Sequence, residues 1–298
     1  MKHLLKLEGK PSAAMEEILA SAKVIKAKRG GGEAKPLDGQ TWALIFTKSS
    51  TRTRVSFEVG IRELGGSVMF LNANDMQLGR GEPIKDTARV LGRMVHGAVI
   101  RTFAQADVEE FAEYSGIPTI NALTDDEHPC QILTDIFTFQ ERRGPIRGKV
   151  VTYVGDGGCN VPVSWVHAAA ALDFELRIAA PSEFQPSTEI LAKAGGNISC
   201  TEDIRAAVKG ADMVYTDVWV SMGMEAEAEA RLAKLAGYQI NGELMRLAKP
   251  DTLVMHCLPA YRGKEIDAET FEAHADTIFT QAENRLHTQK AILAWLAG

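Results

Sequence analysis

The chain has 298 residues, of which 45% are hydrophobic, and this length and composition suit two globular domains with cores of their own. Lys and Arg together number 33 and Asp and Glu 39, so the net charge of −6 offers no general attraction to nucleic acid or to an anionic membrane. The four scattered cysteines exclude a small disulfide- or zinc-stapled fold and are typical of reduced thiols in a cytoplasm. No stretch has the ~20 apolar residues that cross a bilayer, and the first residues lack the apolar core of a signal peptide.

Short runs of β-branched or aromatic residues recur along the chain and alternate with helix-like segments. They predict strands at 42–46, 68–71, 98–100, 149–154, 176–180, 213–216, 253–255 and 277–279. Helical spacing of apolar residues predicts helices through Phe57, Ile61 and Leu64, through Ala88, Leu91 and Val95, over 132–143 and over about 281–296. Apolar strands that alternate with helices are typical of parallel sheets covered on both faces, so we predict an α/β protein with two such sheets.

A domain boundary is predicted after residue 143. The segment 142–148 combines a helix stop, a turn and concentrated charge just before the strongest predicted strand. This divides the chain into a first domain over 1–143 and a second over 144–298, and the terminal helix could return to the first domain.

The segment 46–54 lies between a predicted strand and a predicted helix. Free backbone N–H groups at a helix start bind anions, and hydroxyls and a guanidinium add charge-assisted hydrogen bonds. Ser50, Thr51, Arg52 and Thr53 therefore form a candidate phosphate cradle. An ordinary Ser/Thr helix cap or a solvated basic turn would explain the same residues, and the glycines of a Walker A loop are absent from the sequence.

Polar residues directly follow several predicted strands, as Arg101, Asp156, Asp217 and His256 do. Ligands of parallel α/β sheets bind outside the carboxyl ends of the strands, so these groups are expected to face shared crevices. For Asp156 the ordinary role of a helix N-cap is favoured. In the glycine-rich segment that follows, Asn160 stands where a dinucleotide-binding loop needs its third glycine, and a tight turn that presents Asn160 to a polar ligand explains the glycines equally well.

Two further segments contain a histidine. His128 and Gln131, at a predicted helix start, could hydrogen-bond a small polar ligand, although a structural histidine is the commoner case for such a segment. Cys257 follows a strand, and nearby cations could lower the pKa of its thiol. Its neighbour His256 points to the other side of the strand, which disfavours a thiol-protease pair. For Arg285 the sequence leaves a salt bridge and substrate binding open.

No His pair or His/carboxylate set has zinc-ligand spacing, so we expect no metal.

Several motifs, taken together and in this order, resemble the aspartate/ornithine carbamoyltransferase family. They are Ser-Thr-Arg-Thr-Arg at 50–54, Ser-Phe-Glu at 56–58, Asp-Thr-Ala-Arg-Val-Leu at 86–91, Arg101, His-Pro-Cys-Gln at 128–131, Asp-Val-Trp-Val-Ser-Met-Gly at 217–223, His-Cys-Leu-Pro at 256–259 and Glu-Asn-Arg at 283–285. The likeness covers almost the whole chain. Within the family, the Ser-Met-Gly loop after Asp217 and the His-Cys-Leu-Pro segment are similar to the members that act on ornithine.

The resemblance implies that the first domain binds carbamoyl phosphate, that the second binds L-ornithine, and that a cleft closes between them. The δ-amino group of ornithine would take the carbamoyl group, giving L-citrulline and phosphate in arginine metabolism, with no cofactor. It assigns to carbamoyl phosphate Ser50, Thr51, Arg52, Thr53, Gln77, Arg101, His128, Gln131, Cys257, Leu258 and Arg285. It assigns to ornithine Asn160, Asp217, Ser221 and Met222. The implied catalytic residues are Arg101, His128, Cys257 and Asp217.

The resemblance also implies an assembly. Gln77 matches a position that in the family reaches the site of a neighbouring subunit, which implies a homotrimer with shared active sites. No nucleic acid or membrane partner is expected.

Three alternatives stay open at this stage. A carbamoyltransferase for a diamine is disfavoured because a diamine has no carboxylate for Asn160 to bind. A nicotinamide-dependent dehydrogenase is disfavoured by the same residue, which replaces a required glycine. A non-catalytic carbamoyl-phosphate-binding or scaffold protein is disfavoured by the intact set Arg52, Arg101, His128, Gln131 and Cys257.

Overall fold

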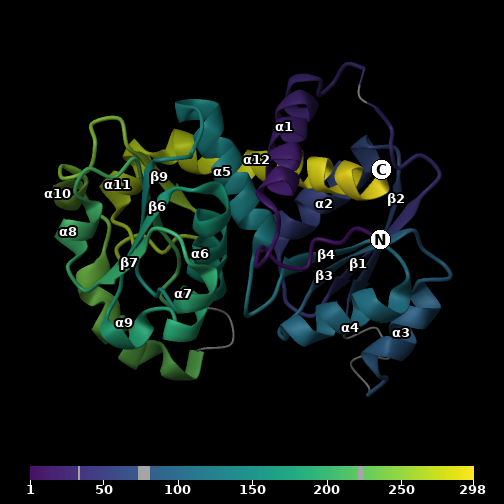
Figure 1. Ribbon diagram of the computed structural model, residues 1–298, viewed down its shortest axis with the longest axis horizontal. Coiled ribbons are helices and arrows are strands. Elements are labelled where there is room, and N and C mark those ends of the chain that lie inside the picture. Colours follow the sequence, from purple (N-terminus) through teal and green to yellow (C-terminus); the bar gives the residue numbers. More distant parts are fainter. Residues whose placement is uncertain (33, 73–80, 221–224) are drawn as a thin grey trace. The chain divides into compact units, whose positions relative to one another are not determined.

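The computed structural model describes residues 1–32, 34–72, 81–220 and 225–298 (Figure 1). The chain divides into two compact units, of which the first comprises residues 1–137 and 283–298 and the second residues 138–282. The division falls within two helices, α5 (Pro129–Arg143) and α12 (Ala275–Ala297). The boundary predicted from the sequence lies further along, at the C-terminal end of α5.

The first unit contains a four-stranded parallel sheet in the order β2-β1-β3-β4. Its strands are β1 (Thr41–Phe46), β2 (Ser67–Asn72), β3 (Gly97–Arg101) and β4 (Thr119–Leu123). Its other helices are α1 (Ser12–Ala27), α2 (Thr51–Glu63), α3 (Ile84–Leu91) and α4 (Gln105–Ser115). In Figure 1 the sheet lies between α1, α2 and α12 on one face and α3 and α4 on the other.

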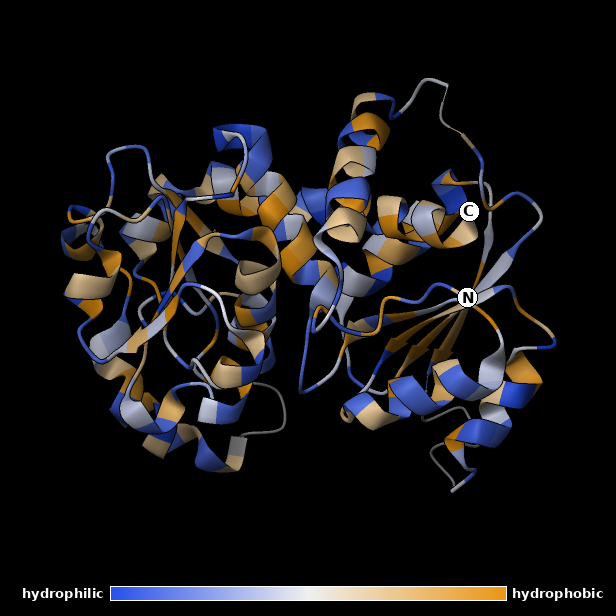
Figure 2. Ribbon diagram, in the orientation of Figure 1, coloured by the Kyte–Doolittle hydropathy of each residue, from blue (hydrophilic) through white to orange (hydrophobic). Residues whose placement is uncertain are grey.

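The two central strands, β1 and β3, are apolar along most of their length because helices cover both faces of the sheet. Figure 2 shows them in orange between helices of mixed colour. Ile45 and Ile100 pack with Val108 and Phe111 of α4. The alternate position, Trp42, faces the other way and lies against Gly97, where an added Cβ would approach the indole to 2.5 Å. Burial on both faces explains why the hydrophobic runs are nearly continuous.

The second unit contains a five-stranded parallel sheet in the order β7-β6-β5-β8-β9. Its strands are β5 (Val150–Val154), β6 (Glu175–Ala179), β7 (Ile198–Thr201), β8 (Met213–Thr216) and β9 (Leu253–His256). Its α-helices include α6 (Asn160–Leu172), α7 (Thr188–Ala194), α8 (Ile204–Val208), α9 (Ala228–Leu235), α10 (Gly242–Met245) and α11 (Ala268–Ala273). Short 3₁₀ turns form at Ser182–Phe184, Glu225–Glu227 and Ala236–Tyr238.

Side chains alternate across this second sheet as the pleat requires. On one face Tyr215 packs edge-on against Trp165 of α6, with ring centroids 5.6 Å apart. On the opposite face Val214 and Val254 join a core cluster with Phe271 of α11. Both units are therefore parallel α/β sheets with helices on both faces, and the predicted fold class is confirmed.

Three predictions about elements were incomplete or wrong. The run 277–279 is helical, because α12 begins at Ala275 and Ile278 enters the core as part of that helix. Strands β4 and β7 were missed; each is a sheet edge and carries polar residues that weaken the apolar signal. Val95 lies beyond the end of α3, although it still packs into the first core.

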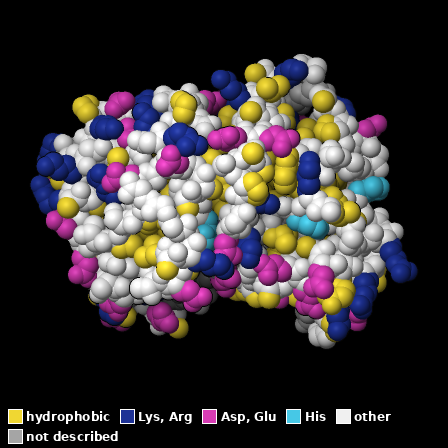
Figure 3. All heavy atoms as spheres, viewed as in Figure 1, with side chains coloured by type: hydrophobic (Ala, Val, Ile, Leu, Met, Phe, Trp, Pro, Cys, Tyr) yellow, Lys and Arg dark blue, Asp and Glu magenta, His cyan; other side chains and the backbone are white. Residues whose placement is uncertain are grey.

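No helix in the described part of the chain combines the length and apolar composition that a bilayer crossing needs. Acidic and basic side chains alternate over the face shown in Figure 3, in keeping with the small net charge.

Candidate functional site

In the first unit the predicted phosphate cradle forms the first turn of α2. Ser50 is the N-cap with an extended backbone, and its hydroxyl oxygen accepts a hydrogen bond from the Thr53 backbone N–H at 3.2 Å. The ordinary capping role is thus present. The cap does not prevent the turn from binding an anion, because the backbone N–H groups of Thr51 and Arg52 at the helix start have no acceptor within the helix itself.

Arg285 joins this turn to the start of α5. Its guanidinium, on α12, donates to the Thr53 hydroxyl at 3.1 Å and to the side-chain oxygen of Gln131. Arg285 is only 3% exposed and Gln131 is fully buried. Both of these partners are neutral groups, an amide and a hydroxyl. A buried cation that keeps its full charge is suited to an anionic ligand.

Gln131 is also held from its other side. Its amide nitrogen donates to the Asp135 carboxylate at 2.9 Å, one helical turn along α5. The carbonyl oxygen of an amide has two lone pairs, so a ligand N–H can share it with Arg285. Asp135 was not predicted from the sequence, although a spacing of four residues on a predicted helix is the signal that would have found it.

His128 and Arg101 complete the group. Arg101 ends β3, and His128 precedes Pro129 at the start of α5; both are buried. Burial and the positive charges of Arg285 and then Arg101 hold the pKa of the His128 imidazole well below its usual value. The ring is therefore neutral at physiological pH, and it can donate one hydrogen bond without titrating.

In the second unit two predicted residues are in direct contact. Asp217 follows β8, and one carboxylate oxygen accepts from the Val218 backbone N–H at 2.7 Å and from the Cys257 thiol at 2.8 Å. The Cys257 thiol thus lies directly against a carboxylate. Leu258 follows Cys257, so both predicted carbamoyl-phosphate residues of this segment belong to the second unit.

His256 has a structural role. Its Nδ1 atom accepts from the Leu258 backbone N–H at 2.8 Å, and its Nε2 atom lies 3.2 Å from the buried Glu265 carboxylate. It therefore cannot act as the base of Cys257 without losing a partner. Potential metal-ligand atoms lie within 4.8 Å of one another on Asp217, His256 and Cys257. A metal ion there would have to displace one of the two contacts that the His256 ring already makes.

Asn160 opens α6 directly after the glycine-rich turn. Asp156 in that turn does not cap the helix, since the N-cap is Cys159, and the favoured interpretation is wrong. Its carboxylate instead accepts from the Gly158 N–H and pairs with Arg231, whose Nε donates to the Trp219 carbonyl at 3.1 Å. Arg231 was missed because nothing near it in the sequence indicates a buried ion pair. Gln77, Ser221 and Met222 lie outside the described residues.

Two parallel α/β units that gather buried cations, amides and a thiol at the carboxyl ends of their strands define the class, an α/β protein with sites for small charged ligands. A family model described as the carbamoyl-P binding domain of aspartate/ornithine carbamoyltransferase matches residues 2–141. The model of the Asp/Orn binding domain of the same family matches residues 147–296. The chain belongs to the aspartate/ornithine carbamoyltransferase family.

Individual relatives match this chain over nearly their whole lengths. The chain is 55% identical to an ornithine carbamoyltransferase of Akkermansia muciniphila, an alignment that covers 100% of this chain and 98% of that protein. It is 50% identical to an ornithine carbamoyltransferase of Nitrosococcus oceani, and that alignment covers 98% of this chain and 96% of that protein.

Among solved structures, an ornithine carbamoyltransferase from Pyrococcus furiosus superposes with a TM-score of 0.92 at 44% identity, covering 100% of this chain and 97% of that one. An anabolic ornithine carbamoyltransferase from Campylobacter jejuni superposes with a TM-score of 0.94 at 43% identity, and the superposition covers 99% of each chain.

Proposed function

We propose that this protein transfers the carbamoyl group of carbamoyl phosphate to the δ-amino group of L-ornithine, which gives L-citrulline and phosphate. The observation that carries the proposal is the buried Arg285, bonded to Thr53 of the anion-binding turn and to Gln131. This arrangement suits a ligand that joins a phosphate to a small amide. The names of relatives that match over nearly the whole chain supply the acceptor.

The first unit holds carbamoyl phosphate. The α2 turn binds the phosphate through backbone N–H groups and through the side chains of Ser50, Thr51, Arg52 and Thr53. Arg285 neutralises its charge, and the side-chain oxygen of Gln131 accepts from the carbamoyl nitrogen.

The carbamoyl carbonyl oxygen faces Arg101, His128 and Thr53. When the neutral δ-amine attacks the carbamoyl carbon, a C–N bond forms and charge gathers on that oxygen. Arg101 supplies a fixed positive charge, and the neutral His128 ring donates a hydrogen bond. The tetrahedral intermediate then collapses: the C–O bond to phosphate breaks, phosphate leaves with the bonding electrons, and an oxygen of the departing phosphate takes the proton that the attacking nitrogen gives up. Donors aimed at the developing oxyanion contribute most of the rate.

The second unit holds ornithine. Asn160, Ser221 and Met222 bind the amino-acid end, and Asp217 accepts from the α-ammonium group, since a carboxylate attracts a cation. Cys257 lies beside the reacting δ-amino end. Its thiol donates a hydrogen bond to Asp217 at 2.8 Å, which joins the residue at the reacting end to the residue at the amino-acid end. A diamine would leave the amide of Asn160 without a carboxylate partner, which favours an amino acid as the acceptor.

The proposal includes the setting of the enzyme. Gln77 would reach the site of a neighbouring subunit in a homotrimer, and the reaction serves arginine synthesis in the cytoplasm. All four cysteines are free thiols, in agreement with a reducing compartment. Sedimentation of the wild type and of a Gln77→Ala variant tests the assembly: the proposal expects a trimer in both, and activity that falls in the variant alone.

The test of the reaction is the product. Purified protein is incubated with carbamoyl phosphate and, separately, with L-ornithine, putrescine, N-acetylornithine and L-aspartate, and ureido compounds are detected colorimetrically. Product with L-ornithine alone supports the proposal. Product with only another amine would discard the acceptor, and no product with any acceptor would favour the scaffold alternative.

A variant that lacks the Arg101 side chain tests the site within the same assay. Its matched control is Arg62→Met, because Arg62 forms an exposed ion pair with Glu58.

A further inference from the structure

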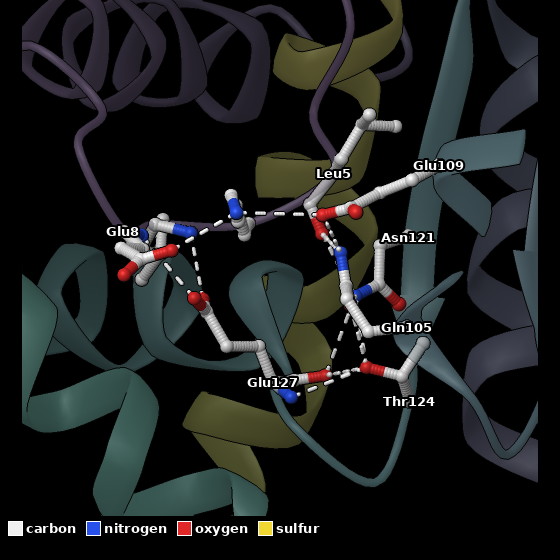
Figure 4. A network of polar contacts seen from close by, with 9 residues as sticks. Leu5, Glu8, Gln105, Glu109, Asn121, Thr124 and Glu127 are labelled. Atoms are coloured by element: carbon white, nitrogen blue, oxygen red, sulfur yellow. Dashed lines mark hydrogen bonds and ion pairs between the residues drawn. The ribbon is translucent and has the colours of Figure 1, made fainter. Parts of the chain in front are cut away.

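Glu127 is a buried carboxylate that the proposed reaction does not use. It immediately precedes His128, and it is only 3% exposed. One carboxylate oxygen accepts from the Leu7 backbone N–H at 2.6 Å, and the other accepts from the Glu8 N–H at 3.2 Å (Figure 4). A side chain next to a catalytic residue thus bonds the backbone of the chain's first few residues.

This N-terminal segment, residues 4–8, is attached firmly to the first unit. Leu4 extends the edge of the sheet beside β4: its N–H donates to the Thr119 carbonyl at 3.0 Å, and its carbonyl accepts from the Asn121 N–H at 2.7 Å. The side chains of Leu4 and Leu7 are fully buried. The segment therefore offers Glu127 two donors at fixed positions.

The backbone of Glu127 is fixed as well. Its carbonyl accepts from the Thr124 N–H at 2.9 Å, and its N–H donates to the Thr124 hydroxyl oxygen at 3.2 Å. That hydroxyl donates to the Gln105 side-chain oxygen at 2.8 Å. Gln105 and Asn121 both donate side-chain N–H groups to the Leu5 carbonyl, at 3.2 and 2.9 Å. Figure 4 shows these bonds as one connected network around the turn that ends at Glu127.

From this geometry we infer that Glu127 is a positioning residue, which fixes the His128 imidazole by tying its turn to the N-terminal segment. The inference rests on the proposed function, because it gives His128 its role at the carbonyl oxygen. When a donor is displaced by a fraction of an ångström, the stabilisation of the transition state falls more than the affinity for substrate does. Loss of Glu127 should therefore lower kcat and leave the KM values nearly unchanged.

The charge around Glu127 adds a second signature. Burial raises the pKa of this carboxyl to about 7, against which the two backbone N–H bonds act. The charged groups around it include Lys6, Glu8 and Lys10 of the N-terminal stretch, Glu109 of α4, and Asp125 and Asp126 of its own turn. The ionised carboxylate accepts both N–H groups, whereas the protonated form turns one oxygen into a donor. Wild-type kcat should then fall as the pH drops below about 7.

The experiment compares Glu127→Gln with Asp126→Asn, a neighbouring carboxylate that is exposed and makes neither backbone bond. The expected result for Glu127→Gln is a kcat about tenfold lower with KM values within a factor of two, and no acid limb near pH 7. Asp126→Asn should match the wild type. In a His128→Ala background Glu127→Gln should have no further effect, because a positioning residue acts only through its partner.

Each outcome decides the point. Equal kcat in Glu127→Gln and Asp126→Asn, or losses that multiply in the His128→Ala background, would overturn the inference. So would an acid limb that persists in Glu127→Gln. Failure of the proposed function is distinct, since the wild type would then form no citrulline at any pH.

Discussion

Ionisation of the buried Glu127 should lower the free energy of unfolding as the pH rises, and Glu127→Gln should remove this part of the pH dependence. The pKa of Glu127 is about 7 in the folded chain and 4.5 when unfolded, so the folded state holds its proton more tightly. The stability that the protonated Glu127 carboxyl gives to the folded state is complete below about pH 4.5, and it is lost as the pH rises through about 7. At about 1.4 kcal/mol for each pH unit, ionisation of this one buried group costs the folded state about 3 kcal/mol by pH 8.5.

The assay is urea unfolding followed by circular dichroism at pH 4.5, 6, 7 and 8.5, for wild type and for Glu127→Gln. Other titrating groups affect both proteins equally, so the difference between the two unfolding free energies isolates Glu127. We expect this difference to move by about 3 kcal/mol in favour of the variant between pH 4.5 and 8.5. Parallel curves would refute the burial argument, and a shift in favour of the wild type would mean that the ionised carboxylate is the stabilised form.

Three further changes test other parts of the molecule. Arg101→Met should lower kcat by about 10² to 10³ with the fold intact by circular dichroism; an unchanged kcat would remove Arg101 from the oxyanion site. Asp217→Asn removes the negative charge that is proposed to bind the α-ammonium group of ornithine. Initial rates should therefore show the KM for ornithine raised roughly tenfold, whereas a rise only in the KM for carbamoyl phosphate would contradict the assignment. Gly97→Ala places a methyl group 2.5 Å from the Trp42 ring, so urea unfolding should show a loss of about 1–3 kcal/mol.

The sequence predicted the fold class because its strongest strands are buried on both faces and read as apolar runs. It failed where that signal is weak or misleading. β4 contains Asn121, whose side chain serves the network around Leu5 and not the core. The β-branched run at 277–279 belongs to a helix, because three residues are too few to separate the two periods.

The site was predictable where a motif is local and hidden where it depends on tertiary contact. The cap at Ser50 and the strand-end positions of Arg101 and Asp217 follow from sequence order alone. The bond between Arg285 and Gln131 joins residues 154 positions apart, and only the folded chain reveals it. The same holds for Glu127, whose donors are 119 and 120 positions away. Partners at such distances leave no periodic trace in a single sequence.

The central claim is the transfer of a carbamoyl group to ornithine, and the stoichiometry of the reaction tests it most directly. Purified protein receives carbamoyl phosphate labelled with carbon-13 and L-ornithine, and labelled citrulline and inorganic phosphate are counted in the same sample. We predict equal amounts of the two products, at a rate that depends on both substrates. Release of phosphate without labelled citrulline would contradict the account.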